Sequence, residues 1–399
     1  MERKGTILSK LFYRKQCKRT KRNIKDAKKV YLSKLLNNKQ NNIQDIYKRI
    51  KFWNKKYTNV ESVCINGRQI TNEKIIANQI NTFFSEVGSD PKTTAKEILK
   101  KCKDETIPIN QLKEANDQIS VREISEIVEK LNTRKASGLD NIENFMLKFG
   151  GEKLIQALFW LFNRIYEQGE SPKIWKKGEI LPIPKVKDQI ITVDKFRPIC
   201  LLSAIGKVME KIINNRLYNL AINNNWISRH QSGFVKQKST MDNLIILQQE
   251  IHCSFRKGEY FVAVFLDIKK AYDSVNRELL LKVIRRKGVN GKIISYLTDF
   301  LGQDRVNVTK FRGTISAENL FRKGLPQGSP ISPLLFNIYL NDITQIIEDK
   351  ILMFADDIVI WDYQSIIKLQ RAGTLAYQMC TDNIHKEKEI EPVTNLNFG

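Results

Sequence analysis

The sequence has few of the residues that build zinc sites and disulfide frameworks. Its three histidines and six cysteines are scattered over 399 residues, with no C-x-x-C pair and no Cys/His cluster. This scarcity excludes a zinc finger and disfavours a disulfide-stapled secreted domain. Free thiols in a reducing compartment fit the pattern, so we expect an intracellular protein that is not secreted.

Long apolar runs are also missing. No stretch of about 18 consecutive apolar residues occurs, so we expect no membrane span. The opening residues MERKG lack the apolar segment of a signal peptide. Apolar side chains nevertheless make up 42 % of the chain, which is enough for a buried core and excludes wholesale disorder.

Acidic residues are scarce at the N-terminal end. The whole chain carries 67 Lys and Arg against 43 Asp and Glu, whereas residues 1–56 carry 19 against 3. The excess favours a polyanionic partner, and we favour nucleic acid over an anionic membrane surface because residues 1–56 are not clearly amphipathic. These residues form either a solvated charged segment or a basic arm that contacts phosphates. The cations that we assign to such contacts are Lys15, Lys18, Arg19, Lys21 and Arg22.

Periodic apolar positions and end signals predict a helical first half. The capping box formed by Ser120 and Glu123 opens one helix, and Gly169 closes another. Residues 91–118 are polar and are expected to be linker. The predicted helices cover 75–87, 120–132, a segment around 154–165, 203–222 and 240–257.

Beyond residue 258, short apolar runs predict strands that end in acidic residues. One run ends in Asp267, and two more meet in a tight turn that carries Asp356 and Asp357. Alternation around Gly313 is typical of a hairpin. The predicted segments are strands at 260–267 and within 350–361, a hairpin at 305–322, and helices at 276–287 and 331–348.

The acidic pair Asp356 and Asp357 points to a metal site. Two like charges about 4 Å apart repel by roughly 4 kcal/mol at an effective dielectric constant of about 20. A divalent cation would offset this cost, and hard oxygen ligands without His or Cys favour Mg²⁺. The alternative is an ordinary β-turn with solvated acids. Asp267 favours the metal, because three carboxylates can hold two ions, whereas Asp273 is expected to be a solvated acid or a helix N-terminal charge.

A third candidate piece is the string GLPQGSPISP at 324–333. Its Pro and Gly residues fix a backbone shape, and the helix N-terminus that follows favours the approach of a phosphate or nucleotide. Gln327 supplies a neutral hydrogen-bonding group. An ordinary junction between loop and helix is the alternative.

The order of these strings resembles that in reverse transcriptases. The strings are FLDIKKAYDSV at 265–275, KGLPQGSPISPLLFNIYLNDI at 323–343 and MFADDIVIW at 353–361. Upstream, KASGLDNI, ILPIPK, FRPICLLSAIGKVMEKIINNRL and QSGFVKQKSTMDNL agree in order and spacing. The chain is most similar to the non-LTR retrotransposon branch (LINE-type, jockey-like) from about residue 120 to 361, and more loosely back to about residue 30.

The resemblance implies an α+β right-hand polymerase with fingers and palm, in which helices pack on an antiparallel palm sheet. It implies RNA-directed DNA polymerisation in the nucleus or cytoplasm, with an RNA template, a DNA primer or target DNA, dNTPs and two Mg²⁺ ions, for which Mn²⁺ could substitute. The implied regions are a basic helical extension and linker at 1–118, the fingers with an extra motif at 119–257, the palm at 258–365 and a divergent tail at 366–399.

The resemblance also implies roles for single residues. Asp267, Asp356 and Asp357 match the metal-binding aspartates, with the Ile268 carbonyl beside the second ion. Tyr272 matches the aromatic residue that excludes a 2′-hydroxyl, although a core aromatic is the alternative. Further nucleotide contacts are implied for Arg197, Gln327, Gly328 and Lys185, the last of which is equally well a surface charge.

After Trp361 the resemblance fades. We expect the lysine-bearing palm segment, the primer grip, the thumb and the endonuclease that precedes the polymerase in this branch to be absent, as in a truncated copy. The alternative function is therefore a catalytically inactive remnant that only binds nucleic acid. The presence of all three aspartates, Arg197 and Gln327 favours chemistry.

Overall fold

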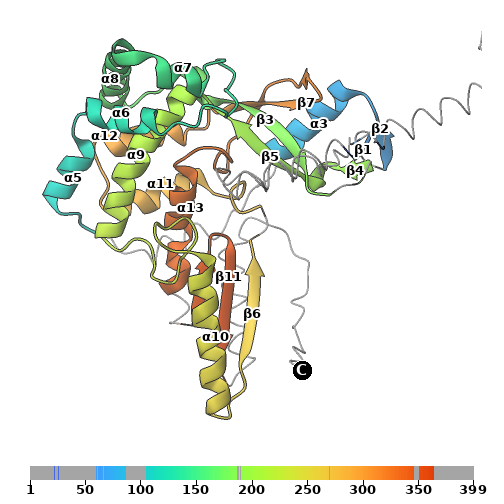
Figure 1. Ribbon diagram of the computed structural model, residues 1–399, viewed down its shortest axis with the longest axis vertical. Coiled ribbons are helices and arrows are strands. Elements are labelled where there is room, and N and C mark those ends of the chain that lie inside the picture. The colour runs from blue at the N-terminus through green and yellow to red at the C-terminus, as the bar shows by residue number, and fades with distance from the viewer. Residues whose placement is uncertain are drawn as a thin grey trace, which may run out of the picture. The chain divides into compact units, whose positions relative to one another are not determined.

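The structure, a computed structural model, describes residues 22, 26, 60, 62–65, 67–86, 105–186, 188, 190–268, 270–345 and 350–363. The chain divides into two compact units, Met1–Asn59 and Val60–Gly399. Figure 1 labels most of the helices and strands named below, all of which belong to the second unit. Of the five arm cations, Arg22 alone is described, as an exposed helical residue. The other four and the tail at 366–399 lie outside the described residues.

Most of the helices share one large hydrophobic core. The central helix of this group is α9, which packs against α5, α6 and α13, while α8 packs against α6 and α12. Trp226, Tyr166 and Phe162 are among the largest side chains that are fully buried there. The helices are α5 (Ile109–Asn116), α6 (Val121–Glu129), α7 (Asn144–Phe149), α8 (Gly151–Gln168), α9 (Ala204–Asn223), α11 (Arg277–Arg286), α12 (Lys292–Phe300) and α13 (Ser332–Leu340).

Local end signals define several of these helices. The predicted capping box is present, because the Glu123 amide donates to the Ser120 hydroxyl and the Ser120 amide donates to the Glu123 carboxylate. Gly169 ends α8 in the left-handed conformation, which glycine adopts without a steric penalty. The helix predicted at 331–348 is shorter than expected, since α13 ends at Leu340 and a 3₁₀ turn follows at Asn341–Gln345.

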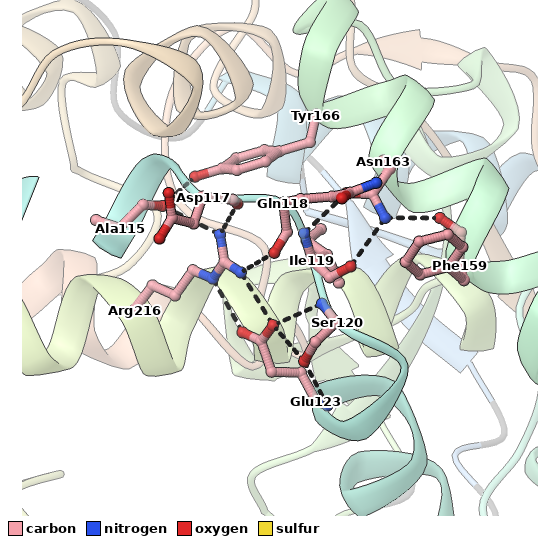
Figure 2. Close-up of polar contacts among 10 residues, drawn as sticks. All are labelled: Ala115, Asp117, Gln118, Ile119, Ser120, Glu123, Phe159, Asn163, Tyr166 and Arg216. Carbon is pink, nitrogen blue, oxygen red and sulfur yellow. Dashed lines mark hydrogen bonds and ion pairs between the residues drawn. The ribbon is translucent and has the colours of Figure 1, made fainter. Parts of the chain in front are cut away.

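The expectation that 91–118 is linker is wrong for residues 105–118, which include α5. Arg216 of α9 holds this segment against the helices by hydrogen bonds. Its guanidinium donates to the Asp117 carbonyl at 2.6 Å and makes two 2.9 Å bonds to the Glu123 carboxylate. Tyr166 donates to the Ala115 carbonyl at 2.6 Å. Figure 2 shows these side chains converging on the connection between α5 and α6.

Two sheets and one helix form a second, smaller core. In the larger sheet the order is β5-β3-β7-β8, with β3 antiparallel to β5 and parallel to β7, and the predicted hairpin is confirmed by the pairing of β7 with β8. Ile80, Phe84, Ile180 and Phe311 meet in the core. The elements are β1 (Ser62–Ile65), β2 (Arg68–Ile70), α3 (Glu73–Glu86), β3 (Lys177–Pro184), β4 (Ile190–Thr192), β5 (Phe196–Leu201), β7 (Val306–Phe311), β8 (Thr314–Ile315) and β9 (Asn319–Leu320).

A third sheet carries the predicted acidic strand ends. It consists of β6 (Val262–Asp267), β10 (Ile351–Phe354) and β11 (Asp357–Asp362), in the order β10-β11-β6 and antiparallel throughout. The helix α10 (Thr240–Arg256) packs against β10. The α+β fold class is therefore confirmed. Among the described residues, no helix is both long and apolar enough to cross a bilayer.

Candidate active site

Two of the three aspartates face each other across neighbouring strands. Asp267 is the last residue of β6 and Asp357 the first of β11, and the two are direct partners in the antiparallel register. Phe354 pairs with Asp357, so that Ala355 and Asp356 form the two-residue turn between β10 and β11. The predicted turn is confirmed, and the strand pairing brings residues about 90 positions apart in the sequence to one sheet end.

The turn is held by a segment from upstream of α10. The Gln231 side chain accepts from the Ala355 amide at 2.9 Å and donates to the Ala355 carbonyl at 3.3 Å. Gly233 lies so close that a Cβ there would be 2.1 Å from the Ala355 nitrogen. Ala355 itself has a φ of 60°, a left-handed conformation that is costly for alanine. The contacts of Gln231 with both backbone groups of Ala355 stabilise this conformation.

The three carboxylates interact electrostatically. Asp267 and Asp357 are exposed, whereas Asp356 is half-buried. Burial raises the pKa of Asp356, and the charges of Asp357 and Asp267 raise it further, whereas a backbone hydrogen bond and the charge of Arg197 lower it. A cation between the carboxylates would relieve their repulsion.

The described residues contain no group of three or more His, Cys, Asp or Glu side chains that is already arranged as a metal cage. The donor set still fits a hard divalent cation, because it consists of carboxylates alone and two of them are open to solvent. Ile268, which follows Asp267, has a buried side chain.

Tyr272 lies beside this turn. Its ring stacks on Phe336 at a centroid distance of 5.2 Å and meets Phe234 edge to face at 6.5 Å. Burial, and to a smaller extent the negative charge of Asp356, raises the pKa of the Tyr272 hydroxyl above its usual range. The ring is thus fixed by two aromatic neighbours within electrostatic reach of the aspartates.

The turn at 326–330 contacts the end of β5. The Cys200 amide donates to the Gln327 carbonyl at 2.8 Å. Gly328 has a φ of 147°, and a Cβ there would be 2.2 Å from the Cys200 carbonyl oxygen. Only glycine therefore permits this approach of the turn to the strand.

Asp273 is not the solvated acid that its sequence context suggested. It is partly buried, and the Gln327 side-chain amide donates to its two carboxylate oxygens at 3.3 and 3.4 Å. Burial raises the pKa of Asp273 to about 6, against the opposing effects of Gln327, Lys270 and Lys185. An ionised Asp273 only accepts hydrogen bonds, so it orients the Gln327 amide nitrogen toward itself.

The two candidate cations near β3 and β5, Lys185 and Arg197, are exposed. Lys185 follows β3 and reaches the Asp194 carbonyl with its ammonium group at 3.3 Å. Arg197 lies on β5 opposite Ile183, and within the described part of the chain its guanidinium has no hydrogen bond or ion pair. The charge of Lys185 acts on Asp273 and that of Arg197 on Asp356, so both side chains are near the acidic groups.

Sequence reasoning missed the residues that support the site. Gln231 lies in the string QSGFVKQKSTMDNL, and Gly233 beside it was a signal of close backbone approach. Glu210 lies within α9 and has 3 % of its surface exposed. Lys207 and Lys211 flank it, so no local pattern distinguished it from an exposed acid.

Comparison with known proteins finds similarity to one class of enzyme. Residues 183–383 match the family described as reverse transcriptase (RNA-dependent DNA polymerase). A probable RNA-directed DNA polymerase from transposon BS of Drosophila melanogaster is 32 % identical over 228 residues, which are 56 % of this chain and 25 % of that protein. The RNA-directed DNA polymerase from the mobile element jockey of the same species is 28 % identical over 293 residues, 70 % of this chain and 32 % of the relative.

The jockey protein of Drosophila funebris is 30 % identical over 253 residues, 61 % of this chain and 27 % of that relative. The matched part of the chain thus spans about a quarter to a third of the length of these relatives. The family match covers β5, β6, β10 and β11, the elements that hold the aspartates and Arg197.

Proposed function

Because the chain belongs to the reverse transcriptase family, in its non-LTR retrotransposon branch, we propose that it is an RNA-directed DNA polymerase. It extends the 3′-hydroxyl of a DNA primer or nicked target DNA with dNTPs, on an RNA template, in the nucleus or the cytoplasm. The palm is the β10-β11-β6 sheet with its helices, within 258–365. The fingers are built from 119–257, which include β3 and β5.

The observation that carries this proposal is the meeting of three carboxylates at one sheet end. Asp267 and Asp357 are register partners, and Asp356 occupies the adjoining turn. We assign two Mg²⁺ ions to these side chains and to the Ile268 carbonyl, with Mn²⁺ as a substitute. Such ions lower the pKa of the primer hydroxyl and stabilise the charge on the leaving pyrophosphate.

The cations and polar groups around the aspartates suit a triphosphate. Arg197 is exposed and unpaired among the described residues, so its guanidinium is available for a bidentate phosphate contact, with Lys185 as a second cation. Gln327 bonds to Asp273, and Gly328 lies against Cys200 on the strand that carries Arg197. We assign the Tyr272 ring, fixed by Phe336 and Phe234, to the sugar of the bound nucleotide, where it would leave no room for a 2′-hydroxyl.

Primer extension tests this function. Purified protein with an RNA template, an annealed DNA primer, dNTPs and Mg²⁺ should extend the primer, and an Asp356→Ala/Asp357→Ala variant should not. The same samples are assayed for RNA binding by fluorescence anisotropy. If both proteins bind RNA equally and neither extends the primer, the chain is a nucleic-acid-binding remnant and the polymerase proposal fails.

A further inference from the structure

A buried carboxylate joins the central helix α9 to the turn at 326–330. The carboxylate of Glu210 accepts a hydrogen bond from the Ser329 hydroxyl. The two side chains come from positions 119 residues apart, and only 3 % and 5 % of their surfaces are exposed. This contact, named here the Glu210–Ser329 latch, joins α9 to the turn at 326–330 and includes none of the three aspartates.

Ser329 also makes hydrogen bonds to the turn on one side and to the start of α13 on the other. Its amide donates to the Pro326 carbonyl at 3.2 Å, and its hydroxyl accepts from the Ile331 amide at 3.3 Å. The hydroxyl therefore has one proton to donate, and it donates this proton to Glu210. With the bond from the Cys200 amide to the Gln327 carbonyl, the turn is fixed at both ends.

Burying the carboxyl group of Glu210 costs free energy of desolvation. Burial raises the pKa of Glu210 to about 7, and the opposing influences are the bond from Ser329 and the charges of Arg305 and Lys207. A leucine of similar volume would avoid this desolvation cost. A buried acid at this position is therefore better explained by the contact that it makes than by core packing.

The latch connects two halves of the proposed nucleotide site. Arg197 and Cys200 are on β5, which leads directly into α9, whereas Gln327 and Gly328 are on the turn. Resting on the proposed function, we propose that Glu210 is a positioning residue that, through Ser329, holds Gln327 and Gly328 at the distance from Arg197 that nucleotide binding requires.

The kinetic test compares two serines of the same segment. Ser329→Ala removes the latch and is expected to raise KM for dNTP about five- to tenfold while kcat changes less than about twofold. Ser332→Ala is the matched control, because Ser332 is equally buried and its hydroxyl has no hydrogen-bond partner among the described residues. KM should stay at the wild-type value in this control. Equal KM values for the two variants, or a fall in kcat alone, would overturn the proposal.

Variants of Glu210 test the other side of the contact. Glu210→Gln keeps an acceptor oxygen and should raise KM less than Glu210→Leu, which removes the acceptor. The double variant Ser329→Ala/Glu210→Leu should have the KM of Ser329→Ala, because the hydroxyl that donates to Glu210 is already absent there. Additive effects would mean that the two residues act separately and would contradict the latch.

A second readout does not depend on catalysis. The Cys200 thiol is buried beside Asn307, whereas the Cys200 amide bonds to the turn, and burial raises the pKa of the thiol to about 11, so maleimide should modify it slowly. Peptide mass spectrometry should detect faster modification of Cys200 in Ser329→Ala and Glu210→Leu than in wild type or Ser332→Ala. Equal rates would overturn the latch. A wild type that modifies as expected but does not extend primers would refute the polymerase function alone.

Discussion

At the scale of single residues, we propose that Tyr272 determines which sugar the site accepts. Its ring is fixed by Phe336 and Phe234 beside the aspartate turn. Replacing Tyr272 with alanine should raise kcat/KM for ribonucleotides relative to deoxynucleotides by on the order of tenfold or more, because the discrimination is steric. Single-nucleotide incorporation with dCTP and CTP measures this ratio.

The control for this prediction is Tyr272→Phe, which keeps the ring and removes only the hydroxyl. It should retain the wild-type preference for dCTP. If Tyr272→Ala keeps that preference as well, Tyr272 is a core aromatic and does not select the sugar.

The buried carboxyl of Glu210 predicts a pH dependence of stability. Its pKa is about 7 in the folded protein, above its ordinary value of 4.5, so the folded state binds more protons between these pH values. Ionisation therefore lowers the free energy of unfolding as pH rises from about 4.5 to about 7, by up to about 3 kcal/mol, and has no further effect above that range.

Glu210→Gln does not titrate, so its stability relative to wild type should increase across this pH window and then level off. Urea unfolding at several pH values between 4.5 and 8 measures the difference. A difference that is independent of pH would show that Glu210 titrates normally in the folded state.

The sequence predicted the three aspartates and their turn, because apolar runs that end in acids leave few other arrangements. It did not predict that Asp273 is partly buried, since its cover comes from Gln327, 54 residues away. Nor did it predict the roles of Glu210 and Gln231, whose partners are 119 and 124 positions distant. Such pairs depend on tertiary packing, which local patterns do not encode.

At the scale of elements, the connection between α5 and α6 depends on Arg216. Replacing Arg216 with methionine leaves the Asp117 carbonyl without its donor and removes both guanidinium bonds to Glu123, which keeps only those from Ser120. We expect a loss of about 2–4 kcal/mol in the free energy of unfolding, because one partner of a largely buried ion pair is removed. Chemical denaturation measures the loss.

Arg122→Met is the matched control. Arg122 pairs with Glu126 on the surface of α6, where 88 % and 52 % of the two side chains are exposed. The control should cost far less than Arg216→Met, because an exposed ion pair contributes little to stability. Similar losses for both variants would mean that Arg216 acts only as a surface charge.

The elements were predicted best where caps mark their ends. The start of α6 was predicted from Ser120 and Glu123, and the end of α8 from Gly169. The helix α5 was not predicted, because its sequence INQLKEAN has one buried residue, Ala115. Its apolar residues have too little helical periodicity to distinguish it from a linker. Its helical state depends on Arg216, Tyr166 and the neighbouring helices.

At the scale of the whole molecule, the excess of positive charge should appear in the salt dependence of RNA binding. Replacing Lys15, Lys18, Arg19, Lys21 and Arg22 with glutamine in the full chain should reduce the slope of log K against log salt concentration. Each single-strand phosphate contact that is lost lowers the slope by about 0.7. Fluorescence anisotropy with a labelled RNA at several salt concentrations measures it.

The control variant carries the same change in net charge at exposed positions of the second unit, all replaced with glutamine. These positions are Lys113, Lys130, Lys153, Arg164 and Lys282. Its slope should fall less than that of the arm variant. Equal slopes in the two variants would mean that residues 1–56 contribute general charge and make no phosphate contacts of their own.

The most direct test of the account is the Mg²⁺ dependence of single-nucleotide incorporation on an RNA-templated DNA primer. We predict a rate that rises to saturation with Mg²⁺, disappears with a chelator, and falls by on the order of a hundredfold or more in Asp267→Asn. Asp117→Asn, at an exposed position, should leave it unchanged. Incorporation that persists without divalent cations, or at the wild-type rate in Asp267→Asn, would contradict the account.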